Sequence, residues 1–264
     1  MGLADLHIHT TYSPDGTSSV SAVLKYAVHH TNLDVIAITD HDKIDGALRA
    51  VDIAPSYGIE VIPGIEVSSA EGHILALFVS RRIPSGLSLE RTVLKTLELG
   101  GVCVVPHPMF NSRMGINPYN ILQALQNPDV SAGLVGFEAF NAGMAGSQRA
   151  IDALQIVNQL PLARVGCSDA HINWMIGHGV TEFPGKSAVN LRQALIKRET
   201  SAHGTYQMTK KDMLFGFIPR LVLRYAGWVS WNAAPSEPLR IVWSGLGGGH
   251  LKSQPLPDNS YQTT

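Results

Sequence analysis

The feature that most constrains the fold is a repeated alternation of short apolar runs with segments whose apolar residues recur at helical spacing. The apolar runs are predicted strands at 3–9, 35–39, 60–67, 73–80, 102–105, 134–140 and 163–168. The predicted helices are 19–30, 44–57, 89–99, 118–126, 146–159 and 189–197. This order predicts a largely parallel α/β sheet covered by helices. The pattern leaves open whether the sheet is an open, doubly wound one or a closed barrel.

The composition fits one large folded domain. The chain has 264 residues, of which 45% are hydrophobic and 16% charged, so a sizeable core is expected. The alternation stops near Gly204, so we predict a barrel domain over 1–204 and a C-terminal extension over 205–264, partly docked and partly flexible. The apolar, aromatic segment 213–231 has two interpretations: a docking segment that closes the barrel, which is favoured, or a helix that binds a partner or an interface.

Charge and cysteine content limit the classes of partner and compartment. A formal net charge of −1 gives no bulk attraction to nucleic acid or to an anionic membrane, so phosphate recognition has to be local. Because no leader or membrane-spanning run stands out, we expect a cytoplasmic protein that does not bind membranes; oligomeric state carries no signal. Cys103 and Cys167 lie in apolar runs and are predicted to be buried, reduced thiols.

The 11 histidines are numerous for this chain, and six of them stand at strand ends. His7 and His9 are two residues apart, so a strand would direct both imidazoles to the same side. Most of the other candidate ligands follow predicted strands, where parallel α/β folds place their active sites, although His73 begins one. The full candidate set is His7, His9, Asp15, His41, Glu66, His73, His107, Asp169 and His171. Nine ligands of these types predict two or three divalent ions, with Zn, Mn or Fe as candidates.

Further candidates lie near these ligands. Asp40 and Asp42 flank His41 and are interpreted as general acids or as groups that orient ligands. Glu138 and Asn141 end a predicted strand: Glu138 would orient a histidine or contact substrate, and Asn141 would bind substrate.

Arginine is the expected clamp for a phosphate group. Arg113 is predicted to bind phosphate, with a solvated loop arginine as the equal alternative, and Arg149 and Arg164 are weaker candidates. Of the remaining histidines, His178 is left unassigned, and the rest are expected at the surface, namely His29, His30, His203 and His250.

Several short motifs together resemble the PHP (polymerase and histidinol phosphatase) superfamily. They are DLHIHT at 5–10, SPDG at 13–16, ITDHD at 38–42, GIE at 64–66, Pro-His-Pro at 106–108 and SDAH at 168–171. The similarity spans about residues 3–200 and is closest to the stand-alone phosphoesterases of the superfamily. It implies a distorted (β/α)7 barrel with a C-terminal extension and a metal-dependent phosphoesterase activity.

The resemblance also implies how the ligands are shared. His7, His9, Glu66 and Asp169 would hold the first ion. Glu66 would bridge to a second ion completed by His73 and His107. Asp15, which stands where some members have histidine, would hold a third ion with His41 and His171. A hydroxide bridging two ions would then attack phosphorus without a protein nucleophile.

The expected activity is hydrolysis of a phosphate ester of a small metabolite or nucleotide, with short oligonucleotides as a variant. Histidinol phosphate phosphatase is one alternative. A metal-binding domain without catalysis, serving an assembly, is another. The complete ligand set favours a hydrolase, because binding alone does not require nine such side chains.

Overall fold

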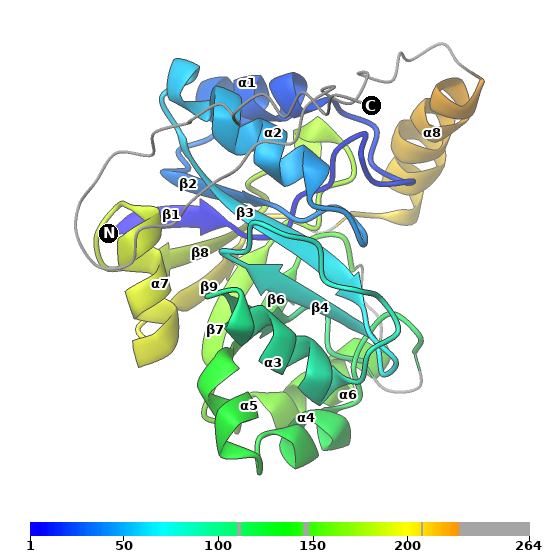
Figure 1. The fold of residues 1–264 in the computed structure, drawn as a ribbon. Coiled ribbons are helices and arrows are strands. Elements are labelled where there is room, and N and C mark those ends of the chain that lie inside the picture. Colours follow the sequence, from blue (N-terminus) through cyan, green and yellow to red (C-terminus); the bar gives the residue numbers. More distant parts are fainter. Residues whose placement is uncertain (110–111, 145–147, 207, 227–264) are drawn as a thin grey trace, which may run out of the picture.

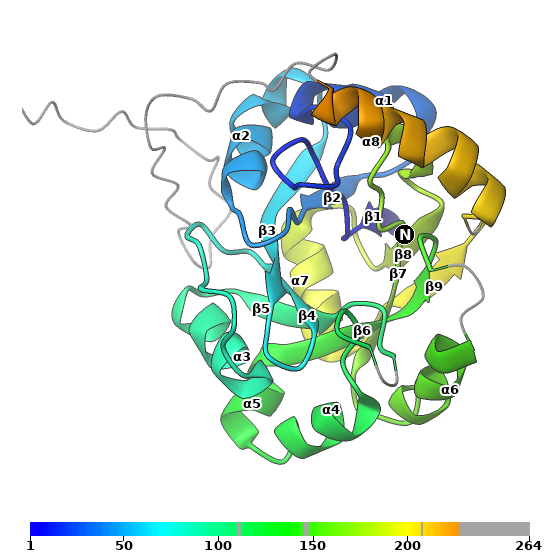
Figure 2. The same ribbon diagram turned by 90° about the vertical axis from the view of Figure 1, so that its right-hand side faces the viewer.

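The computed structural model describes residues 1–109, 112–144, 148–206 and 208–226. Within these ranges nine strands form one sheet in the order β7-β6-β5-β4-β3-β2-β1-β8-β9. Their bounds are β1 Gly2–Asp5, β2 Val35–Ile38, β3 Glu60–Ser68, β4 His73–Leu77, β5 Val102–Val105, β6 Leu134–Asn141, β7 Ala163–Cys167, β8 Gly179–Phe183 and β9 Ser201–Gly204. Figure 2 shows the sheet curving round until its two ends approach each other.

Side-chain contacts join the two ends of the sheet. The hydroxyl of Thr181 in β8 donates to the carbonyl of Gly166 in β7 (3.0 Å), and the hydroxyl of Thr200, just before β9, donates to the carbonyl of Arg164 (2.8 Å). The sheet is therefore a nearly closed barrel, which confirms the predicted barrel and answers the question that the sequence pattern left open.

The barrel is not wholly parallel. Parallel pairing joins β1 to β2, β2 to β3, β5 to β6 and β6 to β7. However, β4 runs antiparallel to both of its neighbours, and β8 runs antiparallel to β1 and β9. Because β4 is reversed, its first residue, His73, pairs with Ser68 at the end of β3. The single candidate ligand at the start of a strand therefore lies at the same edge as the others.

Helices cover the outside of the barrel (Figures 1 and 2). They are α1 Val20–His30, α2 Asp45–Ile53, α3 Leu89–Glu98, α4 Pro118–Ala124, α5 Pro128–Gly133, α6 Gln148–Val157 and α7 Ala188–Lys197. Polar side chains define several starts: Ser19 caps α1, Ser88 caps α3, and Ser187 caps α7 together with Asn190. The predicted 44–57 helix is shorter, because a 3₁₀ turn over Ala54–Ser56 follows α2. The sequence pattern missed α5, β8 and β9.

The strands are buried on both faces, which explains their uninterrupted apolar runs. In β2, Ile36 and Ile38 pack with residues of α1 and α2. The alternate residues, Val35 and Ala37, pack in the barrel interior with Phe183. All four residues of β2 are buried, so two separate cores depend on one short strand.

After β9 the chain crosses the barrel as a π-helical turn, Asp212–Phe217, that continues into α8, Ile218–Tyr225. The guanidinium of Arg224, 1% exposed, donates to the carbonyls of Gly16 and Thr11 (2.9 Å for Thr11). The hydroxyl of Tyr225 donates to the carbonyl of Pro14 (2.8 Å). The described part of segment 213–231 thus docks on the loop after β1, whereas 227–264 lie outside the described residues. None of the helices in the described ranges has the length and apolar character to cross a membrane.

Candidate metal centre

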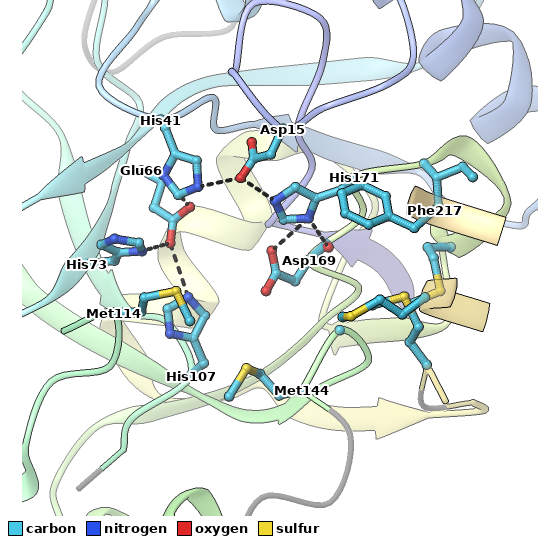
Figure 3. Close-up of a pocket in the computed structure, with 15 residues that line it drawn as sticks. Asp15, His41, Glu66, His73, His107, Met114, Met144, Asp169, His171 and Phe217 are labelled. Carbon is cyan, nitrogen blue, oxygen red and sulfur yellow. Dashed lines mark hydrogen bonds and ion pairs between the residues drawn. The ribbon is translucent and has the colours of Figure 1, made fainter. Parts of the chain in front are cut away.

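All nine candidate ligands gather at one edge of the barrel, where β1, β2, β3, β5 and β7 end and β4 begins. Beyond β1 the chain stays extended, and a bridge between Ile8 and Ala170 lets His7 and His9 point the same way. Both of these imidazoles are fully buried beneath a cavity of about 250 Å³. The other seven side chains line that cavity (Figure 3).

Glu66 lies at the middle of the cluster and is 1% exposed. Its Oε2 lies 3.1–3.2 Å from a ring nitrogen of His7, His9 and His41. Its Oε1 lies 2.7 Å from Nδ1 of His73 and 3.1 Å from Nε2 of His107. One carboxylate therefore contacts five imidazoles, which suits a ligand that is shared between ions.

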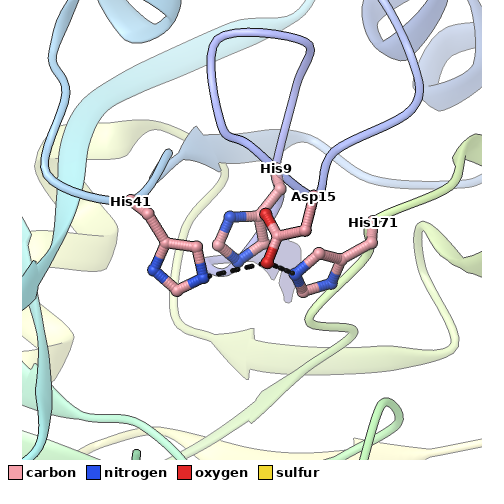
Figure 4. Close-up of side chains that lie close together, drawn as sticks. All are labelled: His9, Asp15, His41 and His171. Carbon is pink, nitrogen blue, oxygen red and sulfur yellow. Dashed lines mark ion pairs between the residues drawn. The ribbon is translucent and has the colours of Figure 1, made fainter. Parts of the chain in front are cut away.

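Two aspartates complete the cluster. Asp169 follows β7 in a left-handed conformation (φ 52°), and its Oδ1 lies 3.3 Å from Nε2 of both His7 and His9. Asp15 directs Oδ2 between the imidazoles of His41 (3.3 Å) and His171 (3.2 Å), as Figure 4 shows. His9, Asp15, His41 and His171 each offer a ligand atom within 4.8 Å of the others, so the third predicted site is assembled with His9 added.

The donor set fits divalent cations. Nε2 of His7 and Nε2 of His9 are 3.0 Å apart, and Oε2 of Glu66 is buried without a hydrogen-bond partner. A tetrahedral ion bound at 2.0–2.1 Å holds its ligand atoms about 3.3 Å from one another, close to these spacings. Three further sets of donors also lie within 4.8 Å of one another: His7, His9 and Glu66; His7, His107 and Asp169; and His41, Glu66 and His73. Which ions each set holds stays a prediction.

The charges of the cluster are strongly coupled. Burial alone would raise the pKa of Glu66, but the imidazoles around it, His7 first, hold that pKa well below its usual range. Burial also disfavours the charged form of His9, yet its close contacts with the carboxylates of Asp169 and Glu66 raise its pKa to about 10. The carboxylates thus attract positive charge at atoms that a metal ion would also use, so protons and cations compete for the same donors.

Glu138 holds the ligands in place rather than lining the cavity. It is fully buried in β6, and its Oε1 pairs with Nδ1 of His7 (2.8 Å). Its Oε2 accepts hydrogen bonds from the backbone N–H of His107 (2.8 Å) and from Nδ2 of Asn141 (2.6 Å). A carboxylate on the far nitrogen of a ligand histidine fixes the ring's tautomer and orientation. This position matches the orienting role among the two interpretations of Glu138.

Asn141 does not fit the substrate-binding role predicted for it. Its Nδ2 donates to Glu138 and to Oδ2 of Asp169 (3.2 Å), and its Oδ1 accepts from the backbone N–H of Met144 (3.0 Å). Both ends of the amide are therefore engaged within the protein, and the side chain supports the ligand Asp169 instead.

Asp40 and Asp42 do not fit the general-acid role. The fully buried carboxylate of Asp40 accepts hydrogen bonds from the N–H (2.6 Å) and hydroxyl (2.8 Å) of Thr10. The carboxylate of Asp42 accepts from the N–H and the hydroxyl of Ser68, both at 2.8 Å. Neither residue lines the cavity. Both carboxylates instead hold the loops that carry the ligands, through Thr10 after His9 and through Ser68 after Glu66.

The three arginines predicted as candidates for phosphate binding do not line the cavity. Arg164 donates to Oδ1 of Asn158 (2.6 Å from Nη2) at the start of β7, the end opposite the ligands, so it is not a phosphate clamp. Arg149 is exposed at the start of α6 and does not line the cavity. Arg113 is also exposed and not part of the lining, although the next residue, Met114, is. Phosphate binding by Arg113 stays a prediction.

The remaining histidines lie outside the centre. His29 and His30 are exposed at the end of α1, and exposed His203 pairs with Glu182 (3.1 Å), as expected for surface residues. His178 pairs with the hydroxyl of Thr205 (3.1 Å). His250 lies outside the described residues.

The wall of the cavity facing the ligands was missed by the sequence patterns. It consists largely of methionines, joined by Phe217, whose ring meets that of His171 edge-on at 5.9 Å. These methionines come from separate loops, so no periodicity connects them along the chain. The sequence shows that the chain has seven methionines, but this number does not indicate where they lie in the fold.

Several known sequences are similar to this chain. The sequence pattern of the PHP domain family matches residues 5–196. An uncharacterized protein of Methanocaldococcus jannaschii is 38% identical over 149 residues, covering 53% of this chain and 81% of that protein. A phosphoribosyl 1,2-cyclic phosphate 1,2-diphosphodiesterase of Eggerthella lenta is 34% identical over 100 residues, 34% of this chain and 37% of that enzyme.

Solved structures share the fold. A two-domain protein from Bacteroides vulgatus, described as containing a predicted PHP-like metal-dependent phosphoesterase, superposes with a TM-score of 0.62. It is 21% identical, and the match covers 83% of this chain and 69% of that one. A putative metal-dependent phosphoesterase from Bifidobacterium adolescentis gives a TM-score of 0.53 at 17% identity, over 82% of this chain and 96% of that one.

Proposed function

Because the chain belongs to the PHP domain family, we propose that it is a metal-dependent phosphoesterase that hydrolyses a phosphate ester of a small metabolite or nucleotide. The observation that carries this proposal is the convergence of nine imidazole and carboxylate side chains on one cavity. Three of these side chains, Glu66, Asp15 and Asp169, each contact at least two histidines, which suits ligands shared within a cluster of two or three ions.

Among the described residues, the cavity lacks the lysine or arginine that commonly binds phosphate. When bound, divalent cations would supply the missing positive charge and lower the pKa of water, so that it becomes a nucleophile near neutral pH. The protein's part is to hold the donors: Glu138 orients His7, Asn141 supports Asp169, and Asp40 fixes the loop after His9.

The size of the cavity favours a small ester. A volume of about 250 Å³ lies just below the usual range of small-molecule sites, about 300–1,000 Å³. A phosphate group with one compact leaving group is of this order, so a small ester is favoured over an oligonucleotide.

Phosphate release by metal-loaded protein tests the proposal. The full chain is stripped of metal, reloaded with Mn²⁺, Zn²⁺ or Fe²⁺, and assayed on phosphomonoesters that include nucleoside mono- and bisphosphates and histidinol phosphate. We expect release that depends on metal and is abolished by His9→Ala. The matched control is His203→Ala, which removes an exposed histidine that pairs with Glu182. A loaded protein inert on monoesters, diesters and oligonucleotides would sink the proposal.

A further inference from the structure

The cavity has two chemically different sides. Part of its lining is the imidazoles and carboxylates described above, and the other part consists largely of methionines, of which Figure 3 labels Met114 and Met144. The sequence contains seven methionines, and five of them line this cavity. They are Met114, Met144, Met175, Met208 and Met213, which we call the methionine wall together with Phe217.

Separate parts of the chain build the methionine wall. Met114 precedes α4, Met144 follows β6, and Met175 lies in a 3₁₀ turn after β7. Met208 and Met213 belong to the segment after β9. Several are fixed through their backbones: Met208 donates to the carbonyl of Ala142 (2.8 Å), and Met114 to the hydroxyl of Ser112 (3.1 Å). Four segments that are far apart in the sequence thus bring methionines to one cavity.

The wall leaves apolar surface open beside the ligands. Met114 is 52% exposed and Met213 is 43% exposed. Both line the cavity, so a ligand bound there could cover their apolar surface. Covering such surface with an apolar ligand is favourable at about 25 cal/mol per Å². Thioether sulfur also makes favourable contacts with aromatic rings, worth about 0.3–1.5 kcal/mol each.

The wall offers little to a sugar. Methionine and phenylalanine side chains do not donate conventional hydrogen bonds, so the hydroxyls of a polyhydroxylated group would lose water there without gaining partners. A hydrogen-bonding group desolvated without a partner costs about 1–3 kcal/mol.

We propose that the methionine wall binds the leaving group of the substrate and that this leaving group carries an aromatic ring. This proposal rests on the phosphoesterase function, because the wall and the metal donors share one cavity: a phosphate held at the donors places its ester substituent against the wall. Segment 208–217, which supplies Met208, Met213 and Phe217, is then a specificity element added to the barrel after its last strand.

A matched pair of substrates tests the proposal. Benzyl phosphate and glycerol phosphate are both esters of primary alcohols, so the bond to be broken is alike, but only the first leaving group is aromatic. With metal-loaded full chain, we expect kcat/KM to be about tenfold or more higher for benzyl phosphate, since burying one apolar side-chain-sized group contributes about 1.5–3 kcal/mol. Equal rates, or a preference for glycerol phosphate, would overturn the proposal.

Variants assign the preference to the wall. Met213→Gln keeps the length of the side chain but makes it polar, and should lower the benzyl-to-glycerol preference about fivefold, whereas Met213→Leu should retain it. The control is Leu214→Gln, which alters the neighbouring residue, 54% exposed and not part of the cavity. If Leu214→Gln reduced the preference as much as Met213→Gln, the wall would not be its source.

A second measurement does not depend on activity. With ¹³C-methyl methionine, the metal-free full chain is titrated with benzyl alcohol, the product that would leave. Methyl signals of the five wall methionines should shift, and those of Met1 and Met109, which do not line the cavity, should not. Shifts without hydrolysis of either ester would count against the phosphoesterase function and leave the aromatic site standing. Unmoved wall signals would overturn the aromatic site, whatever the activity.

Discussion

The two sides of the cavity differ in how they are built. On the ligand side, four of the nine side chains are buried and the other five are at most 34% exposed, and most of them stand at the ends of hydrogen-bonded strands. The methionine wall ranges from buried Met175 (1% exposed) to Met114 (52% exposed), and its side chains stand on loops and on a segment that follows the barrel. On the proposed function, the barrel would hold the metal ions and the peripheral segments would contact the leaving group.

The largest effect should come from Glu66→Gln. The change removes the charge that five imidazoles share and leaves the size of the side chain unchanged. Loss of several kcal/mol of stabilisation by metal lowers the rate about a thousandfold or more. Metal content by mass spectrometry and phosphate release measure the effect. Glu182→Gln, at a partly exposed pair with His203, is the matched control. Full metal content and activity in Glu66→Gln would contradict the ligand assignment.

A smaller loss is expected from Glu138→Gln. This residue contacts the ligands His7 and His107 directly and Asp169 through Asn141, so in the variant the ligands remain but lose the carboxylate that orients them. Such outer partners are worth about 10–100-fold in metal affinity or activity. Competition with a chelator measures the affinity, and the same Glu182→Gln control applies. An unchanged metal affinity would mean that His7 is oriented without this carboxylate.

Arg224→Met tests the attachment of the methionine wall. Arg224 ties α8 to the carbonyls of Thr11 and Gly16, and hydrogen bonds of a charged group are worth about 1.5–3 kcal/mol each. We expect faster amide hydrogen exchange in 208–226 and in the loop after β1, with the barrel strands unchanged, and a several-fold weaker preference for the aromatic ester. Arg220→Met, at an exposed position of α8, is the control. Equal exchange in both variants would show that Arg224 does not hold the segment.

The smallest effect concerns the interior thiols. Burial raises the pKa of Cys103 to about 12, so almost no thiolate is present at pH 8, and Cys167 is also fully buried. Native protein should therefore give no colour with a chromogenic disulfide reagent, and unfolded protein should give two equivalents. Under mild peroxide, exposed Met1, Met114 and Met213 should oxidise before buried Met175. Rapid reaction of a thiol in the native protein would contradict this prediction, because it would show that the barrel opens and exposes a buried cysteine.

The ligand side could be predicted from sequence for physical reasons. His7 and His9 share a face because a strand alternates with period two, and parallel strands bring their ends to one edge. The direction of β4 relative to its neighbours could not be predicted, because a parallel and an antiparallel strand can have the same apolar pattern. Only the structure shows why His73, at the start of its strand, joins the cluster.

Other features depend on orientation, which local patterns do not encode. Asp40 and Asp42 stand beside His41 in the sequence, but a left-handed Asp42 (φ 52°) and the hydrogen bonds of Thr10 and Ser68 turn both carboxylates away from the cavity. The short strands β8 and β9 carry polar residues and lack a long apolar run, so they were missed. The methionine wall is a property of the tertiary structure alone, because its members meet from unconnected loops.

The place of β1 in the sheet bears on the order in which the protein is made. β1 lies between β2, which follows soon after it in the chain, and β8, where Gly2 pairs with Phe183. A growing polypeptide therefore holds its first strand with one side unpaired until most of its length has been synthesised. His7 and His9 emerge first, and Asp169 and His171 come near the end of the barrel, so the full donor set cannot form on a shorter nascent chain. By contrast, the donors of the set His7, His9 and Glu66 have all been synthesised by the end of β3, whereas the set of His7, His107 and Asp169 is complete only after β7.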